Sequence, residues 1–170
     1  MNPLVKLAKT NLEQFVKTSQ AMSVPQYLSA ELAQQRACYV YAFQKPGRHL
    51  RAMFGGPLPR QRSLAEEIIH NSITILDYAS RPIKKADLSS LTYAVAVLEP
   101  LHRISNKDHL DPENFGLYLT SDRGKSSIIL PQRTGIETPD DQVAIAMREA
   151  GIQANQEVVT MYRFLVTYHE

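Results

Sequence analysis

Cysteine is nearly absent from this chain. Cys38 is the only cysteine among 170 residues, so no disulfide can form within the chain. It lies in the apolar run from Cys38 to Phe43, where a cysteine usually behaves as a small core residue. We therefore interpret Cys38 as a structural side chain, with a reactive thiol as the alternative.

Long apolar runs are absent as well. No stretch approaches the ~20 apolar residues that a membrane-spanning helix needs. The first residues, Met1 to Leu7, lack the continuous apolar segment of a secretory signal. We expect a cytoplasmic protein with no membrane partner.

Metal-ligand patterns are missing too. No two histidines stand one helical turn apart, and no second cysteine is available, so we expect no metal and no other cofactor. Ser63 and Ser72 stand in no recognisable nucleophile motif. The histidines are His49, His70, His102, His109 and His169.

Acidic residues are absent between Glu31 and Glu66, although the whole chain has a formal net charge of only +2. That acid-free stretch contributes six positive charges, on Arg36, Lys45, Arg48, Arg51, Arg60 and Arg62. This pattern indicates a local face that attracts anions. It argues less well for nucleic-acid binding, which usually needs basic charge over a broad surface.

The spacing of apolar residues and turn signals predicts an α+β fold in one domain, residues 1–170. A helix begins at Pro3 with Asn2 as its N-cap. Two hairpin–helix–strand units follow, which indicates a duplicated unit, with 1–98 and 116–170 as possible subunits. The expected strands are 38–43, 49–54, 91–98, 116–120, 126–130 and 158–168. One expected helix runs from Leu64 to about Tyr78, after a capping box formed by Ser63 and Glu66, and another runs from Pro139 to Gly151, with Thr138 as N-cap and Gly151 as stop.

The stretch from Leu50 to Ser63 holds the strongest sign of chemistry. It leads a strand through Gly55 and Gly56 into a helix N-terminus, where free backbone N–H groups and the helix dipole favour phosphate or carboxylate. Nearby arginines can add bidentate contacts. The alternative is that the glycines only shape a turn and the arginines are solvated, because no nucleotide-binding motif is matched.

The same stretch resembles the AMMECR domain family. The family's hallmark run Leu-Arg-Gly-Cys-Ile-Gly is answered by Leu50-Arg51-Ala52-Met53-Phe54-Gly55. Similar segments follow in order at 63–67, 91–98, 116–119, 130–132 and 162–164. The resemblance implies an α+β fold and no settled activity. It also implies a possible Memo-like or radical SAM protein partner, since family members often occur beside such proteins.

Two departures from the family pattern affect the expected site. Met53 replaces the hallmark cysteine, and a thioether cannot become the thiolate that a nucleophile or firm zinc ligand needs. The family's Asp-Pro-Arg-Phe appears as Asp77-Tyr78-Ala79-Ser80, which keeps only the acid. The chain therefore has either a specialised ligand or a lost catalytic role.

We expect a binding or accessory domain for a small anionic ligand or an acidic patch on a protein partner. The candidate ligand-binding residues are Arg51, Met53, Gly55, Gly56, Arg60, Arg62, Gln132 and Arg163, of which the last two follow only from the resemblance. The alternative is an enzyme in which Asp77 is the acid or base and Arg51 holds substrate; these two residues could also form a structural ion pair. Nucleic-acid binding is a third and less favoured hypothesis.

Overall fold

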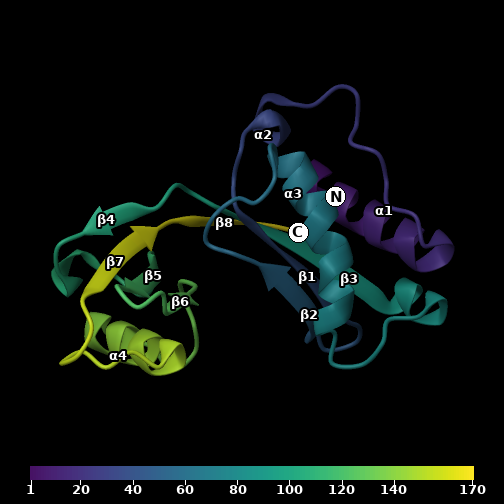
Figure 1. Ribbon diagram of the computed structural model, residues 1–170. Coiled ribbons are helices and arrows are strands. Elements are labelled where there is room, and N and C mark those ends of the chain that lie inside the picture. Colours follow the sequence, from purple (N-terminus) through teal and green to yellow (C-terminus); the bar gives the residue numbers. More distant parts are fainter. The chain divides into compact units, whose positions relative to one another are not determined.

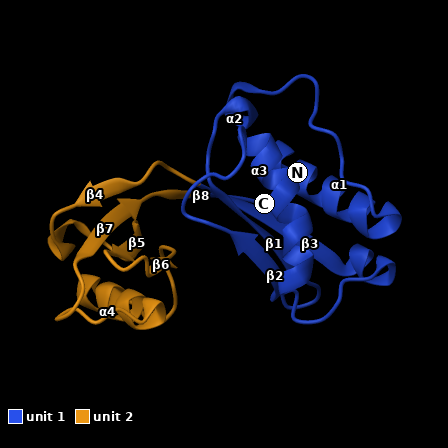
Figure 2. Ribbon diagram, in the orientation of Figure 1, with its two compact units in different colours: residues 1–97, 167–170 blue, residues 98–166 orange.

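The computed structural model describes residues 1–170 and forms two compact units, each with its own sheet (Figure 1). Unit 1 comprises Met1–Val97 and Thr167–Glu170, and unit 2 comprises Leu98–Val166 (Figure 2). Helices accompany two antiparallel sheets, so the predicted α+β class is confirmed.

Unit 1 is built around a four-stranded sheet with strand order β2-β1-β3-β8. Helices α1 and α3 lie on one face of this sheet (Figure 1). The elements are α1 (Pro3–Thr18), α2 (Ala30–Ala33), β1 (Cys38–Gln44), β2 (His49–Gly55), α3 (Leu64–Thr74), the 3-10 helices η1 (Ile75–Tyr78) and η2 (Lys85–Ser90), β3 (Leu91–Leu98) and β8 (Val166–His169).

The two long helices of unit 1 begin at the predicted caps. The Asn2 side chain accepts the N–H of Leu4 at 2.9 Å, and the Ser63 hydroxyl accepts the N–H of Glu66 at 3.2 Å. The second helix is shorter than predicted: α3 ends at Thr74, and the chain continues to Tyr78 as η1, because the last turn tightens to 3-10 geometry.

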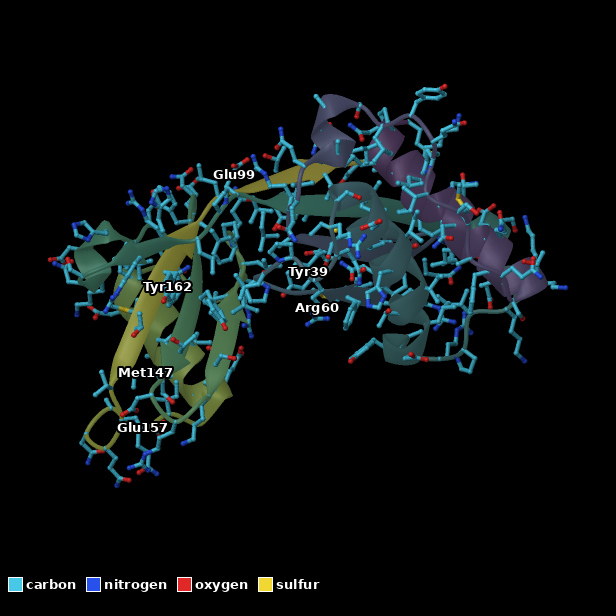
Figure 3. All side chains as sticks on the ribbon, turned by 45° about the horizontal axis from the view of Figure 1, so that its top comes forward. Tyr39, Arg60, Glu99, Met147, Glu157 and Tyr162 are labelled. Carbon is cyan, nitrogen blue, oxygen red and sulfur yellow. The ribbon has the colours of Figure 1, made fainter.

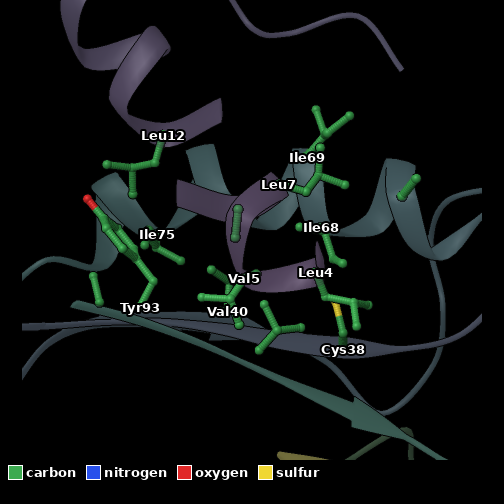
Figure 4. Packing of buried hydrophobic residues seen from close by; sticks show 14 of the residues in the cluster. Leu4, Val5, Leu7, Leu12, Cys38, Val40, Ile68, Ile69, Ile75 and Tyr93 are labelled. Carbon is green, nitrogen blue, oxygen red and sulfur yellow. The ribbon is translucent and has the colours of Figure 1, made fainter. Parts of the chain in front are cut away.

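The core of unit 1 lies between the two helices and one face of the sheet (Figure 4). Cys38, Val40 and Ala42 alternate along β1 and face the helices, as the period of two in a strand requires. The helices contribute fully buried side chains such as Leu12 and Ile68. Cys38 is one of these core residues.

One buried polar residue joins three segments of unit 1. Asn11 is fully buried, and its amide nitrogen donates to the Ile69 carbonyl and the Ser72 hydroxyl, both at 2.8 Å. Its amide oxygen accepts the N–H of Met22 at 2.7 Å. Because an unsatisfied buried amide costs about 1–3 kcal/mol, these bonds specify how α1, α3 and the segment after α1 pack.

Unit 2 is a second four-stranded sheet, with strand order β4-β7-β5-β6, and one helix. Leu117, Leu119 and Ile129 are fully buried in its core together with Ala146 of the helix. The elements are β4 (His102–Ile104), the 3-10 helix η3 (Lys107–His109), β5 (Gly116–Ser121), β6 (Ser126–Ile129), α4 (Pro139–Ala150) and β7 (Val159–Phe164).

Helix α4 has the predicted ends. The Thr138 hydroxyl accepts the N–H of Asp141, and the Asp141 carboxylate accepts the N–H of Thr138. The helix ends at Gly151, which has a positive φ of 64° that suits a residue without a side chain.

The last predicted strand, 158–168, is wrong as a single element. It is two strands, β7 and β8, which belong to different sheets. The break lies at Leu165, whose carbonyl accepts the N–H of Glu99 at 2.9 Å, so the chain leaves one ladder before it joins the other. The short elements α2 and β4 were not predicted, because three or four residues carry almost no periodic signal.

The hairpin, helix and strand occur in the same order in both units, and the strand pairing is also the same. In each unit the strand after the helix pairs antiparallel with the first strand of the hairpin, β3 with β1 and β7 with β5. A duplicated origin stays a prediction. Unit 2 begins at Leu98 rather than 116, and residues 167–170 return to unit 1.

An ion pair in unit 2 yields a pH prediction. Lys125 Nζ lies 2.6 Å from Glu157 Oε1, and the Glu157 side chain is 1% exposed. The Lys125 ammonium lowers the pKa of Glu157 from 4.5 to about 2. The native state therefore favours the carboxylate, and this stabilisation is full above pH 4.5 and lost as the pH falls towards 2.

We expect the free energy of unfolding to fall less steeply between pH 4.5 and 2 in Glu157→Gln than in the wild type. Urea denaturation over a pH series measures this slope. Glu113→Gln is the matched control, because Glu113 is exposed and its carboxylate makes no ion pair. Equal slopes in the wild type and Glu157→Gln contradict the prediction.

Candidate functional site

The predicted site lies at the end of the β1–β2 hairpin in unit 1. Strand β2 is an edge strand, and the chain runs from its last residue, Gly55, through a loop to the start of α3 at Leu64. This loop contains Gly56, Arg60 and Arg62. Its conformation decides whether backbone N–H groups face solvent.

The backbone N–H groups of the loop are already bonded to the chain's own carboxylates. Glu67 Oε2 accepts the N–H groups of Arg60 and Gln61 at 2.9 and 2.8 Å. Glu66 Oε2 accepts the N–H of Arg62 at 2.9 Å. The prediction of free N–H groups for an external anion is therefore wrong for these three, because acids in the first turn of α3 fill that role.

Glu67 is the residue that organises the loop. It is 1% exposed, and its second oxygen, Oε1, lies 3.4 Å from the amide nitrogen of Asn71. Asn71 also donates to the Cys38 carbonyl at 3.0 Å, so the loop, α3 and β1 share one buried polar network. Sequence reasoning missed the role of Glu67, since the capping box draws attention to Glu66 instead.

Gly55, the last residue of β2, and Gly56, the first residue of the loop, have different neighbours. A Cβ at Gly55 would lie 2.4 Å from the Cys38 carbonyl oxygen and 2.5 Å from Cγ of Tyr39, so only glycine fits against β1. A Cβ at Gly56 would lie 3.2 Å from a terminal nitrogen of Arg60. Gly55 thus serves packing within the hairpin, and Gly56 leaves room for the Arg60 guanidinium.

Arg60 is exposed and makes no ion pair. Its Cζ lies 5.2 Å from the centre of the Phe54 ring, within the range of a cation–π interaction. Figure 3 labels Arg60 and Tyr39, which both belong to this part of unit 1. Burial raises the pKa of Tyr39 to about 12, although the positive charge of Arg60 acts in the opposite direction.

Two further rings surround Phe54. The ring centres of Phe54 and Tyr78 lie 4.9 Å apart, and those of Phe54 and His70 lie 6.4 Å apart. Tyr78 is 62% exposed. We call Phe54, Arg60, His70 and Tyr78 the Arg60 face; it combines one unpaired guanidinium with accessible aromatic surface.

Arg51 is buried, with 5% of its surface exposed, and faces no carboxylate. Its guanidinium donates to the Ser80 hydroxyl and to the Pro82 carbonyl, both at 3.2 Å, and its Nε has no partner. Its own carbonyl accepts the N–H of Ser80 at 3.0 Å. Arg51 therefore fixes the segment after η1 to β2.

The possible ion pair between Arg51 and Asp77 is not formed in the structure. Asp77 lies exposed in η1 and makes no ion pair with Arg51, whose donors reach a hydroxyl and a backbone carbonyl. Arg51 donates to two uncharged acceptors that follow η1 in the chain, the Ser80 hydroxyl and the Pro82 carbonyl, and not to the Asp77 carboxylate. A catalytic role for Asp77 stays a prediction.

Four other candidates have these surroundings. Met53 is half-buried opposite Tyr41 in the β1–β2 ladder, and the Arg62 side chain is exposed. Gln132 and Arg163 belong to unit 2. Gln132 has a φ of 59° and donates its N–H to the Pro112 carbonyl at 2.8 Å, whereas Arg163 donates to the His109 carbonyl at 2.8 Å and lies 4.4 Å over the Phe115 ring.

No group of three or more histidine, cysteine, aspartate or glutamate side chains is placed to hold a metal ion. None of the helices combines the length and the apolar character needed to cross a membrane. The candidate site consists of arginine, aromatic rings and a buried carboxylate network.

A model of the AMMECR1 family matches residues 5–169. The chain belongs to the AMMECR1 family. It is 30% identical over 172 residues to a protein of Clostridium acetobutylicum, of which it spans 36%, while 99% of this chain is covered. It is 28% identical over 167 residues to a protein of Thermotoga maritima, with 97% of this chain and 95% of that protein covered.

A solved structure has the same fold. An uncharacterized protein of Pyrococcus horikoshii superposes with a TM-score of 0.82 over 97% of this chain and 88% of that chain, at 22% sequence identity. At that identity the likeness concerns the fold alone. The resemblance expected from the Leu50–Gly55 segment is thus confirmed at the level of the AMMECR1 family, and the site residues stay predictions.

The environment of Cys38 yields a prediction about its reactivity. Burial raises the pKa of the Cys38 thiol, and the nearby Glu67 carboxylate acts in the same direction. The thiol is fully buried, so we expect native protein to react with Ellman's reagent at pH 8 at least a hundredfold more slowly than protein in 6 M guanidinium chloride. Absorbance at 412 nm measures the rate.

The control is Tyr27→Cys, because Tyr27 is 87% exposed. The introduced thiol should react rapidly in the native state, whereas Cys38 should react rapidly only after unfolding. Two equivalents of rapid reaction in native Tyr27→Cys would contradict the structural interpretation of Cys38.

Proposed function

We propose that this AMMECR1-family chain is a binding domain for a small anionic ligand, and that the Arg60 face is where the ligand binds. The anionic group would bind the Arg60 guanidinium, and a flat apolar part would pack against the rings of Phe54 and Tyr78. No biochemical step is assigned to the chain by this proposal.

The proposal rests on one observation: the Arg60 guanidinium is exposed, is held in position, and contacts no carboxylate of the chain. Arg60 is fixed at its backbone by Glu67, at its side chain by the Phe54 ring, and has room beside Gly56. A guanidinium offers a planar set of N–H donors that matches a carboxylate or phosphate with two parallel bonds. These donors meet no carboxylate of the chain, so they are available to a ligand.

The aromatic rings support a ligand with a flat part. Phe54, His70 and Tyr78 come from β2, α3 and η1, so their positions are set by packed elements rather than by one free loop. Rings present a large contact area at a low cost in side-chain entropy. An apolar group next to the anion would gain from this surface.

The Glu67 network supports tight placement of the site. Buried hydrogen bonds hold the backbone of Arg60 and Gln61 before any ligand arrives. Preorganisation of this kind lowers the entropy that binding must overcome. The same network leaves no loop N–H of Arg60, Gln61 or Arg62 for the ligand, so side chains would provide recognition.

Other roles stay predictions. An enzyme with Asp77 as acid or base would need a substrate beside an exposed carboxylate that Arg51 does not contact. Association with a Memo-like or radical SAM protein follows only from the family resemblance. The Arg60 face is the more specific proposal, because Arg60, His70 and Tyr78 each contact the Phe54 ring.

Phenyl phosphate is a suitable probe because it joins a dianion to one ring. We expect Arg60→Ala to weaken its binding at least tenfold, which corresponds to about 1.4 kcal/mol. Arg60→Lys should recover only part of the loss, since an ammonium lacks the planar set of donors. Isothermal titration calorimetry measures both dissociation constants.

Arg148→Ala is the control, because it removes an exposed arginine of α4 that makes no ion pair. It should bind phenyl phosphate like the wild type. Wild-type affinity in Arg60→Ala, or an equal loss in Arg148→Ala, would overturn the proposal.

A further inference from the structure

A hollow of about 430 Å³ lies elsewhere on unit 1, at the hairpin turn that connects β1 and β2. Its walls come from α1, from the turn and from η2, and apolar side chains of η2 and β3 contribute to its lining. Its lining residues are Lys9, Glu13, Lys17, Lys45, Lys85, Leu88, Ser89 and Leu91. We call it the lysine hollow.

Four ammonium groups and one carboxylate line this hollow. Glu13 lies between two of them: its Oε1 is 2.8 Å from Lys9 Nζ, and its Oε2 is 3.6 Å from Lys17 Nζ. Lys45 and Lys85 make no ion pair. Because like charges in one hollow repel each other, a multiply charged anion would relieve an excess of positive charge.

The walls of the hollow are held together by hydrogen bonds. The N–H of Lys45 donates to the Ser90 carbonyl at 2.8 Å, and the Gln44 amide donates to the Ser90 hydroxyl at 2.7 Å. These bonds fix the turn against the end of η2. The backbone position of Lys45 is therefore set without a ligand, against the 3-10 helix that begins with Lys85.

The lining also contains apolar surface and a hydroxyl. Leu88 and Leu91 are 6% and 4% exposed, and the exposed Ser89 offers a hydrogen-bond donor. Asp87, the acid of η2, does not line the hollow, and its carboxylate accepts the N–H of Lys84 at 2.8 Å. Leu88 and Leu91 thus add apolar lining, and Glu13 is the one acid among the lining residues.

The lysine hollow and the Arg60 face lie towards opposite ends of the β1–β2 hairpin. Phe54 pairs with Val40, whereas Lys45 follows the last residue of β1. Lys45 lies five positions after Val40 along an extended chain, which corresponds to about 17 Å. The two places are therefore distinct sites.

We infer that the lysine hollow binds a soluble small molecule with adjacent phosphoryl groups, of the diphosphate class. Ammonium groups act as mobile point charges that suit several phosphoryl oxygens at once, whereas the planar Arg60 guanidinium suits two oxygens of one anionic group. The volume lies within the range of small-molecule sites. Lys45 and Lys85 are the principal ligands, since Glu13 partly neutralises Lys9 and Lys17.

Inorganic pyrophosphate is the probe that tests this inference. Isothermal titration calorimetry in 50 mM salt should show pyrophosphate binding to the wild type, and the double variant Lys45→Gln/Lys85→Gln should bind at least tenfold more weakly. Orthophosphate should bind more weakly than pyrophosphate to the wild type, because it bridges fewer ammonium groups. Arg60→Gln shows whether pyrophosphate binds at the Arg60 face instead of the hollow.

The matched control is Lys6→Gln/Lys84→Gln, which removes two charges from exposed lysines of the same α1 and η2 region that do not line the hollow. It should bind pyrophosphate like the wild type. An equal loss in both double variants would reduce the effect to net charge and overturn the inference, as would absence of pyrophosphate binding at millimolar concentration. Loss of binding in Arg60→Gln alone would assign the diphosphate to the Arg60 face instead.

Discussion

The buried carboxylate of Glu67 is the interaction on which the candidate site depends. It is almost fully enclosed, accepts two backbone N–H groups from the loop after β2, and contacts the Asn71 amide that also holds β1. A buried carboxylate is tolerated only when such bonds compensate for its lost hydration. The loop therefore has one favoured path into α3, and Arg60 is placed over Phe54 as a result.

In this arrangement a glycine-rich turn that leads into a helix does not by itself indicate an anion-binding site. Such turns often present backbone N–H groups to an external anion. Here the first turn of α3 supplies its own anions, Glu66 and Glu67, so the N–H groups of Arg60, Gln61 and Arg62 are satisfied before any ligand is present. The two proposed sites therefore rely on side chains: a guanidinium among rings towards one end of the hairpin, and lysines at the other.

The sequence predicted the elements well where local signals are strong. Helix starts were predicted correctly from three caps, Asn2, Ser63 and Thr138, and one helix end from the stop at Gly151. Each of these residues acts on a neighbouring backbone group. The family follows from segments spread over nearly the whole chain. The site was predicted less well. The possible Arg51–Asp77 ion pair is not formed, and Glu67 was overlooked, because both depend on which groups the fold brings within hydrogen-bonding distance. The lysine hollow was also missed, since its cations lie on three separate elements.

Amide hydrogen exchange of Arg60 and Gln61 shows whether Glu67 holds the loop after β2. Glu67→Met removes both acceptor oxygens while keeping a side chain of similar length that tolerates burial. We expect loss of protection at these two amides, with protection retained at Val40 in β1 and Leu119 in β5. Unchanged protection of Arg60 and Gln61 in a folded Glu67→Met protein would contradict the claim that Glu67 sets the loop and, through it, the Arg60 face.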